Sequence, residues 1–431
     1  MRLLFFLVGI PVLAQAPARY PDARQSDPNV LGWMQGSPPP PAKRIRFDDG
    51  SYFNFPQFRW SFSHWRELLP TVAISRGSGP VSALPRVLDP RIDALVFEPT
   101  NTRSPMTWKH SLETNYTDGI VVVHQGRIVY EQYFGALDAE RPHIAFSVTK
   151  SLFGTIVATL IHEKKINAHA RIDSYLPELK SSGFGDATVA QVLDMTSALK
   201  YTETYGQPVS DLADYARALG VSPRPSNYQG PSSVYDYLAK VPKDGTHGDT
   251  FTYRTINTEV LAWLIARVEG ESAQDVLARR IWSRLGAEGD AYIALGSAGA
   301  ISAGGGFNAR LRDLARFGEM IRRHGQFNGH QILPSAVVEE IRRGGSKEAF
   351  AKNPSYRSLP GWTYHHHWWI SHQPNGMFAA RGIHGQGLYI YPDAEVVIAR
   401  FASHPLAGNV NFDATSLPAF DAVANYLSKI E

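Results

Sequence analysis

The sequence predicts an α+β fold in which an antiparallel sheet is flanked by helices and joined to a mostly α-helical lobe. Two observations support this prediction. A β-hairpin pattern after the first quarter of the chain is matched by a second one near the C-terminus, and helical periodicity dominates the segment between them. We expect the two hairpins to share one sheet, which the intervening helices would cover. With 431 residues, 43% of them hydrophobic, the chain is long enough for two or three lobes.

Residues 1–16 are typical of a secretory signal peptide. Met1-Arg2 is followed by the apolar run 3–13 and then by the small residues Ala14 and Ala16. Eleven apolar residues are too few to span a bilayer, so we expect an exported protein, periplasmic or secreted, without a membrane span. The alternative is a buried or uncleaved N-terminal helix. Cleavage after either alanine fits the pattern.

Residues 17–105 are predicted to form an N-terminal extension packed on the body of the protein. The four prolines after Ser37 are incompatible with helix and with sheet pairing, and are typical of a polyproline segment. Seven aromatic residues follow within fourteen positions, which is more large apolar surface than a disordered linker carries. These residues are Tyr52, Phe53, Phe55, Phe58, Trp60, Phe62 and Trp65.

We expect residues 106–170 and 291–431 to form the sheet lobe, and residues 171–290 to form the helical lobe. The first hairpin is predicted from two β-branched runs on either side of a Gln125-Gly126 turn. The second hairpin is predicted over residues 388–399 around a turn that begins at Pro392. The helices are indicated by apolar residues at helical spacing, above all in 152–161 and 260–268.

The composition excludes several classes of function. Lys and Arg total 43 and Asp and Glu total 40, so the net charge of +3 gives no basic surface for nucleic acid. The absence of cysteine excludes disulfides, thiolate zinc sites, iron–sulfur clusters and a cysteine nucleophile. The chain also lacks the Gly-x-Ser-x-Gly, His-Glu-x-x-His and nucleotide-loop motifs. We therefore expect no cofactor and no nucleic-acid partner.

Three consecutive histidines, 365–367, suggest a metal site but do not predict one. Residues 364–370 are predicted to form a strand, on which His365 and His367 would share one face and His366 would take the other. Two ligands with no carboxylate nearby in the sequence are too few for a structural site. We predict that no metal binds there.

A Ser-x-x-Lys motif, Ser147 to Lys150, opens the apolar helix that covers residues 152–161. The i, i+3 spacing places both side chains on one helix face. The unpaired N–H groups at a helix start favour an oxyanion and disfavour a protonated lysine. Burial would lower the pKa of Lys150 further, so that the neutral amine could take the proton of Ser147. Taken alone, the motif fits a helix cap and a surface lysine equally well.

A second pair with the same spacing, Ser197 and Lys200, is predicted to be structural. It follows a short helical stretch and precedes a polar segment, so Lys200 should be solvated and protonated. We expect this pair to lie in a loop at a helix end.

The segment from His143 to Ser151, with the hairpin before it, resembles the serine β-lactamase-like hydrolases of the class C type. Four later stretches also resemble that family: 193–197, 251–257, 304–308 and 382–386. Within the superfamily, the chain resembles the 6-aminohexanoate-dimer hydrolases, through residues 33–36, 58–64 and 201–205. The resemblance extends over nearly the whole chain after residue 16.

The resemblance implies a β-lactamase/transpeptidase-like fold and a set of catalytic roles. Ser147 would attack an amide or ester carbonyl, Lys150 would accept its proton, and Tyr253 would pass a proton to the leaving group. The N–H groups of Ser147 and of Ile383, the residue after Gly382, would hold the oxyanion.

The chain departs from the β-lactamase pattern at two motifs. Ala380-Arg381-Gly382 replaces Lys-Thr-Gly, so that only Arg381 could meet a carboxylate, and Thr255 replaces an asparagine that binds lactam side chains. Both changes favour esters or linear amides as substrates. Tyr205 matches a tyrosine that contacts the scissile amide N–H in the 6-aminohexanoate-dimer hydrolases, and Asn308 and His384 are candidate pocket residues.

The sequence therefore predicts a serine hydrolase that cleaves small esters or linear amides through an acyl-serine intermediate. One alternative is a D-alanyl peptidase or β-lactamase with the same fold. The other is a non-catalytic exported binding protein. A homodimer is compatible with the sequence.

Overall fold

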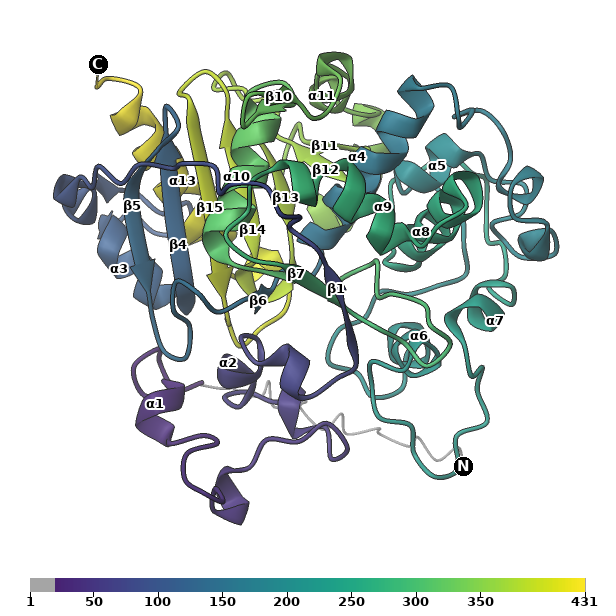
Figure 1. Ribbon diagram of the computed structural model, residues 1–431, viewed down its shortest axis with the longest axis horizontal. Coiled ribbons are helices and arrows are strands. Elements are labelled where there is room, and N and C mark those ends of the chain that lie inside the picture. Colours follow the sequence, from purple (N-terminus) through teal and green to yellow (C-terminus); the bar gives the residue numbers. More distant parts are fainter. Residues whose placement is uncertain (1–19, 431) are drawn as a thin grey trace, which may run out of the picture.

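The computed structural model describes residues 20–430, and the predicted signal peptide lies outside these residues. A seven-stranded antiparallel sheet forms the centre of the molecule, in the order β11-β12-β13-β14-β15-β4-β5 (Figure 1). Its strands are β4 (Thr117–His124), β5 (Arg127–Tyr133), β11 (Thr363–His365), β12 (Trp368–Ile370), β13 (Phe378–Arg381), β14 (Gly387–Tyr391) and β15 (Val396–Ala402).

Both predicted hairpins are confirmed, and they lie side by side in this sheet. Strands β4 and β5 are joined by Gln125 and Gly126, which both have positive φ, as tight hairpin turns require. Strands β14 and β15 form the second hairpin, and Val397 of β15 pairs with Val123 of β4. Segments from the two ends of the chain thus complete one sheet.

Helices cover both faces of the sheet, because successive side chains of a strand point to opposite sides. Val121 and Val123 pack in the same core as α4 (Val148–His162) and α10 (Leu311–Arg322). Ile120 and Val122 pack in a second core with α3 (Trp108–Thr114) and α13 (Asp413–Leu427). The nucleophile candidate Ser147 lies at the start of α4, the most deeply buried of these helices.

Five helices with long irregular connections form the helical part of the chain, which lies to the right of the sheet in Figure 1. They are α5 (Val189–Leu193), α6 (Asp211–Leu219), α7 (Val234–Leu238), α8 (Ile256–Glu269) and α9 (Ala273–Arg280). Helix α8 packs against both α4 and α5, so the segment before α8, which contains Tyr253, is brought next to the start of α4. Two further helices, α11 (Ser335–Arg343) and α12 (Lys347–Ala351), precede β11.

A smaller four-stranded sheet links the N-terminal extension to the body. Its order is β1-β7-β8-β6, and the extension contributes β1. The strands are β1 (Thr71–Ile74), β6 (His143–Ile144), β7 (Ala291–Ala294) and β8 (Phe307–Ala309). The short helices α1 (Pro28–Leu31) and α2 (Phe58–Ser61) precede β1, and two strand pairs, β2 (Val96–Phe97) with β3 (Met106–Thr107) and β9 (Gln326–Phe327) with β10 (His330–Gln331), lie elsewhere.

The aromatic residues of the extension support the residue that precedes Ser147. Phe62 stacks on Phe58 at 4.7 Å and meets the ring of Phe146 edge-on at 4.9 Å. The Phe62 carbonyl also accepts a hydrogen bond from the N–H of Ile144, at 2.8 Å. Phe146 has a φ of +42°, a conformation that costs energy for a side chain of this size and persists only when its surroundings hold it. The extension therefore helps to fix the turn that presents Ser147.

Across residues 20–430, no helix combines the length and the apolar character that crossing a membrane requires.

Candidate active site

Ser147 and Lys150 are in direct contact at the start of α4. The Lys150 Nζ donates a hydrogen bond to Ser147 Oγ at 2.8 Å, and a second one to the carbonyl of Gly304. The Ser147 side chain makes no capping hydrogen bond to α4, so its hydroxyl is available for chemistry. Lys150 is 0% exposed and Ser147 is 8% exposed. The amine is thus held beside the hydroxyl, away from water.

The environment of Lys150 brings its pKa close to neutrality. Burial lowers the pKa to about 8, and the negative charges of Glu203 and Glu259 oppose that effect. At pH 7 about a tenth of the molecules therefore carry a neutral amine there. A base with a pKa near the working pH is the most effective kind for removing a proton during a reaction.

Tyr253 lies over the same pair of residues. Lys150 Nζ is 5.1 Å from the centre of its ring, which stacks on Trp369 at 5.7 Å. Burial raises the pKa of Tyr253 well above the ordinary value, although hydrogen bonding to the Ser147 side chain lowers it in part. Tyr253 therefore keeps its phenolic proton at neutral pH and can pass one proton on while it receives another.

The backbone N–H groups of Ser147 and Ile383 are the candidate donors to an oxyanion. Within residues 20–430, neither the N–H of Ser147 nor that of Ile383 is hydrogen-bonded. The two segments meet closely at Gly382, where an added Cβ would lie 3.0 Å from Ser147 N and 2.8 Å from the carbonyl oxygen of Ala145. Only glycine allows this approach. The N–H groups of Ser147 and Ile383 are therefore candidate donors to an oxyanion.

Sequence reasoning missed Glu259. This residue holds the loop that contains Gly304, whose carbonyl accepts a hydrogen bond from Lys150. Its carboxylate accepts hydrogen bonds from the N–H of Gly304 at 2.8 Å, from the N–H of Ala303 at 3.2 Å and from the hydroxyl of Tyr215. Because the Gly304 carbonyl in turn binds Lys150, Glu259 helps to position the Lys150 amine. The sequence feature that could have indicated its role is the position of this glutamate among the buried apolar residues of α8.

Sequence reasoning also gave no role to Glu203, which joins two predicted site residues. Tyr205 donates its hydroxyl hydrogen to Glu203 Oε1 at 2.9 Å. The Thr255 N–H donates to Oε2 at 2.9 Å, and the Thr255 hydroxyl donates to Oε1. Thr255 is thus engaged within the protein.

Comparison with known proteins places this geometry in a family. The Beta-lactamase family model matches residues 112–416. The chain belongs to the Beta-lactamase family. It is 33% identical over 391 residues to the 6-aminohexanoate-dimer hydrolase of Paenarthrobacter ureafaciens, a match that covers 91% of this chain and 92% of the relative.

Solved structures show the same β-lactamase-family fold. A Bacillus anthracis protein with a provisional 6-aminohexanoate-dimer hydrolase name superposes with a TM-score of 0.80 at 33% identity, over 88% of this chain and 96% of that one. An octameric penicillin-binding protein homologue from Pyrococcus abyssi has a TM-score of 0.58 at 16% identity, over 74% and 76% of the two chains, and shows the fold alone. This β-lactamase-family protein is a serine hydrolase of amide or ester substrates.

Two predicted pocket residues of this β-lactamase-family chain are enclosed instead. Asn308 is 0% exposed in β8, where its amide binds the Gly306 carbonyl at 2.8 Å. His384 is buried against Phe58 and Phe146, and its Nδ1 lies 2.7 Å from the carbonyl oxygen of His404. Asn308 and His384 are both buried in this conformation, His384 against aromatic residues of the extension, so a substrate could touch neither side chain.

Arg381 is not available as a substitute for the β-lactamase lysine. Its guanidinium is buried, pairs with Asp413 at the start of α13, and lies 5.6 Å and 5.5 Å from the ring centres of Trp362 and Trp369. The charge of Arg381 is thereby balanced within the protein. The expectation that Arg381 could meet a substrate carboxylate is not supported by this arrangement.

The second Ser-x-x-Lys pair is structural, as predicted. Lys200 is exposed, and the buried Ser197 hydroxyl donates to Asn257 Oδ1 at 2.6 Å. A cavity of about 570 Å³ opens near Lys200 between α6 and α7 and is lined among others by Asp211 and Tyr237. Neither Ser147 nor Lys150 lines this cavity.

Two of the three histidines form a turn, and the prediction of one strand over residues 364–370 is wrong. His365 pairs with Trp368 across the β11–β12 hairpin, so His366 and His367 are its two turn residues, both with positive φ. The turn is held from outside, since Asp194 binds the His366 N–H at 2.9 Å and Ser151 binds the His367 carbonyl at 2.6 Å. These contacts offset the strain.

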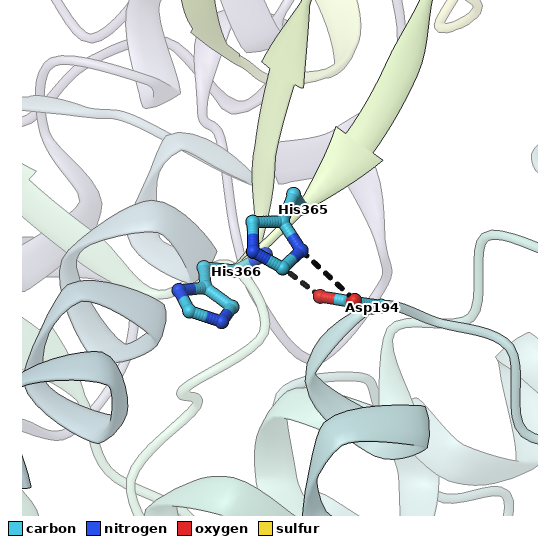
Figure 2. Close-up of side chains that lie close together, drawn as sticks. All are labelled: Asp194, His365 and His366. Atoms are coloured by element: carbon cyan, nitrogen blue, oxygen red, sulfur yellow. Dashed lines mark hydrogen bonds and ion pairs between the residues drawn. The ribbon is translucent and has the colours of Figure 1, made fainter. Parts of the chain in front are cut away.

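Figure 2 shows Asp194 beside His365 and His366, where three potential metal ligands lie within 4.8 Å of one another. Both carboxylate oxygens of Asp194 are engaged, one by His365 Nδ1 and one by the His366 N–H, each at 2.9 Å. The two imidazole rings stack at 3.8 Å and 22°, and since nitrogen lone pairs lie in the ring planes, they do not converge on one point. The cluster therefore acts as a clamp between the end of α5 and the hairpin turn.

Proposed function

We propose that this protein hydrolyses linear amides, and esters of similar size, with Ser147 as nucleophile and Lys150 as its base. The observation that supports this most directly is the 2.8 Å contact between the fully buried Lys150 Nζ and Ser147 Oγ. The substrate class is proposed from the 33% identity to a 6-aminohexanoate-dimer hydrolase over most of both chains.

The proposed reaction follows from the positions of the groups. Neutral Lys150 takes the proton of Ser147 as Oγ attacks the carbonyl carbon, and the N–H groups of Ser147 and Ile383 bind the oxyanion. Tyr253 gives its proton to the leaving nitrogen or oxygen and regains one from protonated Lys150. Water then attacks the acyl-serine and gives up a proton by the same route, which releases the acid and restores Ser147.

A substrate panel tests the proposal. We expect turnover of short linear amides, including 6-aminohexanoate dimer, and of short-chain esters. We expect little turnover of nitrocefin or of a D-Ala-D-Ala peptide. Ser147→Ala protein serves as the blank for each substrate. Turnover of nitrocefin or the D-Ala-D-Ala peptide alone would instead favour the β-lactamase or D-alanyl peptidase alternative, and no turnover at all would favour a binding protein.

The rate should depend on pH through Lys150. Because the pKa of Lys150 is about 8 and the neutral form is the base, kcat/KM should rise about tenfold per pH unit below that value and level off above it. The measurement is kcat/KM for one uncharged ester from pH 6 to 10, with circular dichroism at each pH to show that the protein stays folded. A profile that is flat from pH 6 to 9 would contradict the role given to Lys150.

Gly382→Ala should damage the oxyanion site. The added methyl group would lie 3.0 Å from Ser147 N and 2.8 Å from the Ala145 carbonyl oxygen, so the two segments must separate. We expect kcat to fall by about 10²- to 10³-fold, as for loss of one oxyanion donor, with a smaller change in KM. Gly79→Ala is the matched control, since nothing lies within 4 Å of its added Cβ. If both variants keep wild-type kcat, this oxyanion assignment is wrong.

We also propose export, on the basis of residues 1–16. Expression of the full chain in a bacterial host, followed by fractionation and intact-mass measurement, tests the proposal. Export is expected to remove 14 or 16 residues, the two cleavage points that the alanines allow. Full-length protein in the cytoplasmic fraction would contradict it.

A further inference from the structure

Glu259 is a buried carboxylate that the proposed reaction does not use. It lies in the first turn of α8 among apolar residues and is 4% exposed. Burial raises its pKa, because a carboxylate loses its hydration there. A carboxylate in such a place keeps its charge only where hydrogen-bond donors and a positive charge compensate it.

The donors around Glu259 favour its ionised form. Oε1 accepts hydrogen bonds from the Gly304 N–H at 2.8 Å and from the Tyr215 hydroxyl, and Oε2 accepts one from the Ala303 N–H at 3.2 Å. Burial and the charge of Glu259 raise the pKa of Tyr215 well above its ordinary value, so the phenol keeps its hydrogen and donates it. An ionised carboxylate accepts from all three donors, and hydrogen bonds of this kind stabilise its charge.

Lys150 supplies the positive charge, and Gly304 lies between the two side chains. The Gly304 N–H donates to Glu259, and its carbonyl accepts from Lys150 Nζ. A Cβ added to Gly304 would overlap Thr255 Cγ2 and lie 3.1 Å from Glu259 Oε1, so only glycine fits there. Burial lowers the pKa of Lys150 and the charge of Glu259 opposes that effect, while burial raises the pKa of Glu259 and the charge of Lys150 opposes it. The two charges thus stabilise each other.

We propose that Glu259 is a positioning residue whose negative charge stabilises the ammonium that Lys150 becomes when it takes the proton of Ser147. As Oγ forms its bond to the carbonyl carbon, the O–H bond of Ser147 breaks and the proton moves to Nζ, so that an ammonium and an oxyanion appear together. The candidate backbone donors serve the oxyanion, and Glu259 serves the ammonium. The inference rests on the proposed function and adds the counter-charge of its base.

The pH dependence of a Glu259 variant should report on Lys150, because the neighbouring groups hold one protonation state between pH 6 and 10. Burial keeps the phenols of Tyr215, Tyr235 and Tyr253 protonated by raising the pKa of each. Burial and the charge of Lys150 lower the pKa of His367 to about 3, so this imidazole stays neutral. Glu203, which also faces Lys150, is unchanged in every variant.

The test is the pH profile of kcat/KM on a p-nitrophenyl ester for wild type and Glu259→Gln. Glutamine keeps an acceptor for the Gly304 N–H but carries no charge, so Lys150 should lose its proton more readily. We expect the midpoint of the profile, near pH 8 in wild type, to fall by about one pH unit. The plateau above it should also fall, because a weaker base removes the Ser147 proton less readily.

Two further comparisons separate charge from shape. Glu259→Asp keeps the charge at a shorter reach, so its rate should fall without a midpoint below that of wild type. Glu259→Asn should again have a lower midpoint than Glu259→Asp, which repeats the test if the glutamine variant does not fold. Glu319→Gln is the matched control, because Glu319 is a buried glutamate of α10 that pairs with Arg322, and its profile should equal that of wild type.

A purely structural role predicts a shift in the other direction. If Glu259 only held the loop, its loss would admit water to Lys150, and the midpoint would rise toward the ordinary lysine value of 10.5. The inference is overturned if Glu259→Gln leaves the midpoint unchanged or raises it, or if Glu259→Asp lowers it as much as Glu259→Gln does. Equal thermal unfolding midpoints show that the variants compared are folded.

Covalent labelling separates this inference from the proposed substrate class. A p-nitrophenyl phosphonate reacts when Ser147 Oγ displaces p-nitrophenolate from phosphorus, and intact mass counts the adduct at each pH. A labelling midpoint that falls in Glu259→Gln, in a protein that turns over neither esters nor amides, would support the role of Glu259 and contradict the substrate proposal. Wild type that is neither labelled nor active would overturn both.

Discussion

Replacing Ser147 by alanine is expected to remove turnover of amides and esters together, with kcat falling by about 10⁴- to 10⁶-fold, as when the nucleophile of a catalytic serine unit is removed. The reason is geometric. Within residues 20–430 the Lys150 amine donates two hydrogen bonds, one to the Ser147 hydroxyl and one to the Gly304 carbonyl, so no other hydroxyl is in contact with it. The measurement is kcat on the p-nitrophenyl ester, together with the intact mass of protein quenched during turnover. Wild type should gain the mass of one acyl group and the variant should not.

The matched control is Ser197→Ala, which changes the serine of the second Ser-x-x-Lys pair. It should keep wild-type turnover, although loss of its hydrogen bond to Asn257 costs about 1 kcal/mol of unfolding free energy. Ser147→Ala should leave the unfolding free energy nearly unchanged, because the Ser147 side chain does not cap α4. An acyl adduct on Ser147→Ala protein, or turnover within tenfold of wild type, would show that another residue is the nucleophile.

The parts of the structure that depend on local pattern were predictable from the sequence. The Gln125-Gly126 turn between two β-branched runs is enough to specify a hairpin, and the apolar residues of 152–161 specify a buried helix. The Ser147–Lys150 contact is of the same kind, since it follows from i, i+3 spacing on a helix and from the burial of that helix.

The parts that depend on contacts between distant segments were not predictable in this way. Glu203 and Glu259 reach Lys150 from other elements, and nothing in their own sequence neighbourhoods specifies that meeting. The turn at His366 and His367 has positive φ without glycine or asparagine, and it is stabilised by Asp194 and Ser151 from elsewhere in the chain. Because the local sequence lacks the residues that favour such a turn, it predicted a strand instead.

Packing against the extension explains the remaining difference. His384 follows the oxyanion candidate Ile383, so its position in the sequence indicated a pocket residue. In the structure Phe53, Phe58 and Phe62 surround its ring. The extension thus packs behind Ser147, an arrangement that periodicity within the sheet lobe alone could not show.

Replacing Lys150 by methionine is expected to lower kcat/KM on esters and amides by about 10³- to 10⁴-fold while making the protein more stable at pH 7. The loss of rate is that of a missing general base, because the methionine side chain has a similar length and no proton acceptor for Ser147. The rate that remains should lose the rise below pH 8. The control is Lys200→Met, which changes an exposed lysine of the second pair and should alter neither rate nor stability.

The gain in stability follows from the same depressed pKa. Burial lowers the pKa of Lys150 to about 8 from an ordinary value of 10.5, so the unfolded chain binds this proton more tightly than the folded protein does. The resulting cost to folding is fully present below pH 8 and disappears as the pH rises from 8 to 10.5. At pH 7 its removal should raise the unfolding free energy by up to about 3 kcal/mol, and at pH 10.5 by much less. Urea unfolding of both proteins at the two pH values measures this difference in unfolding free energy. A variant less stable than wild type at pH 7 would show that burial of the charged Lys150 amine does not destabilise the folded protein.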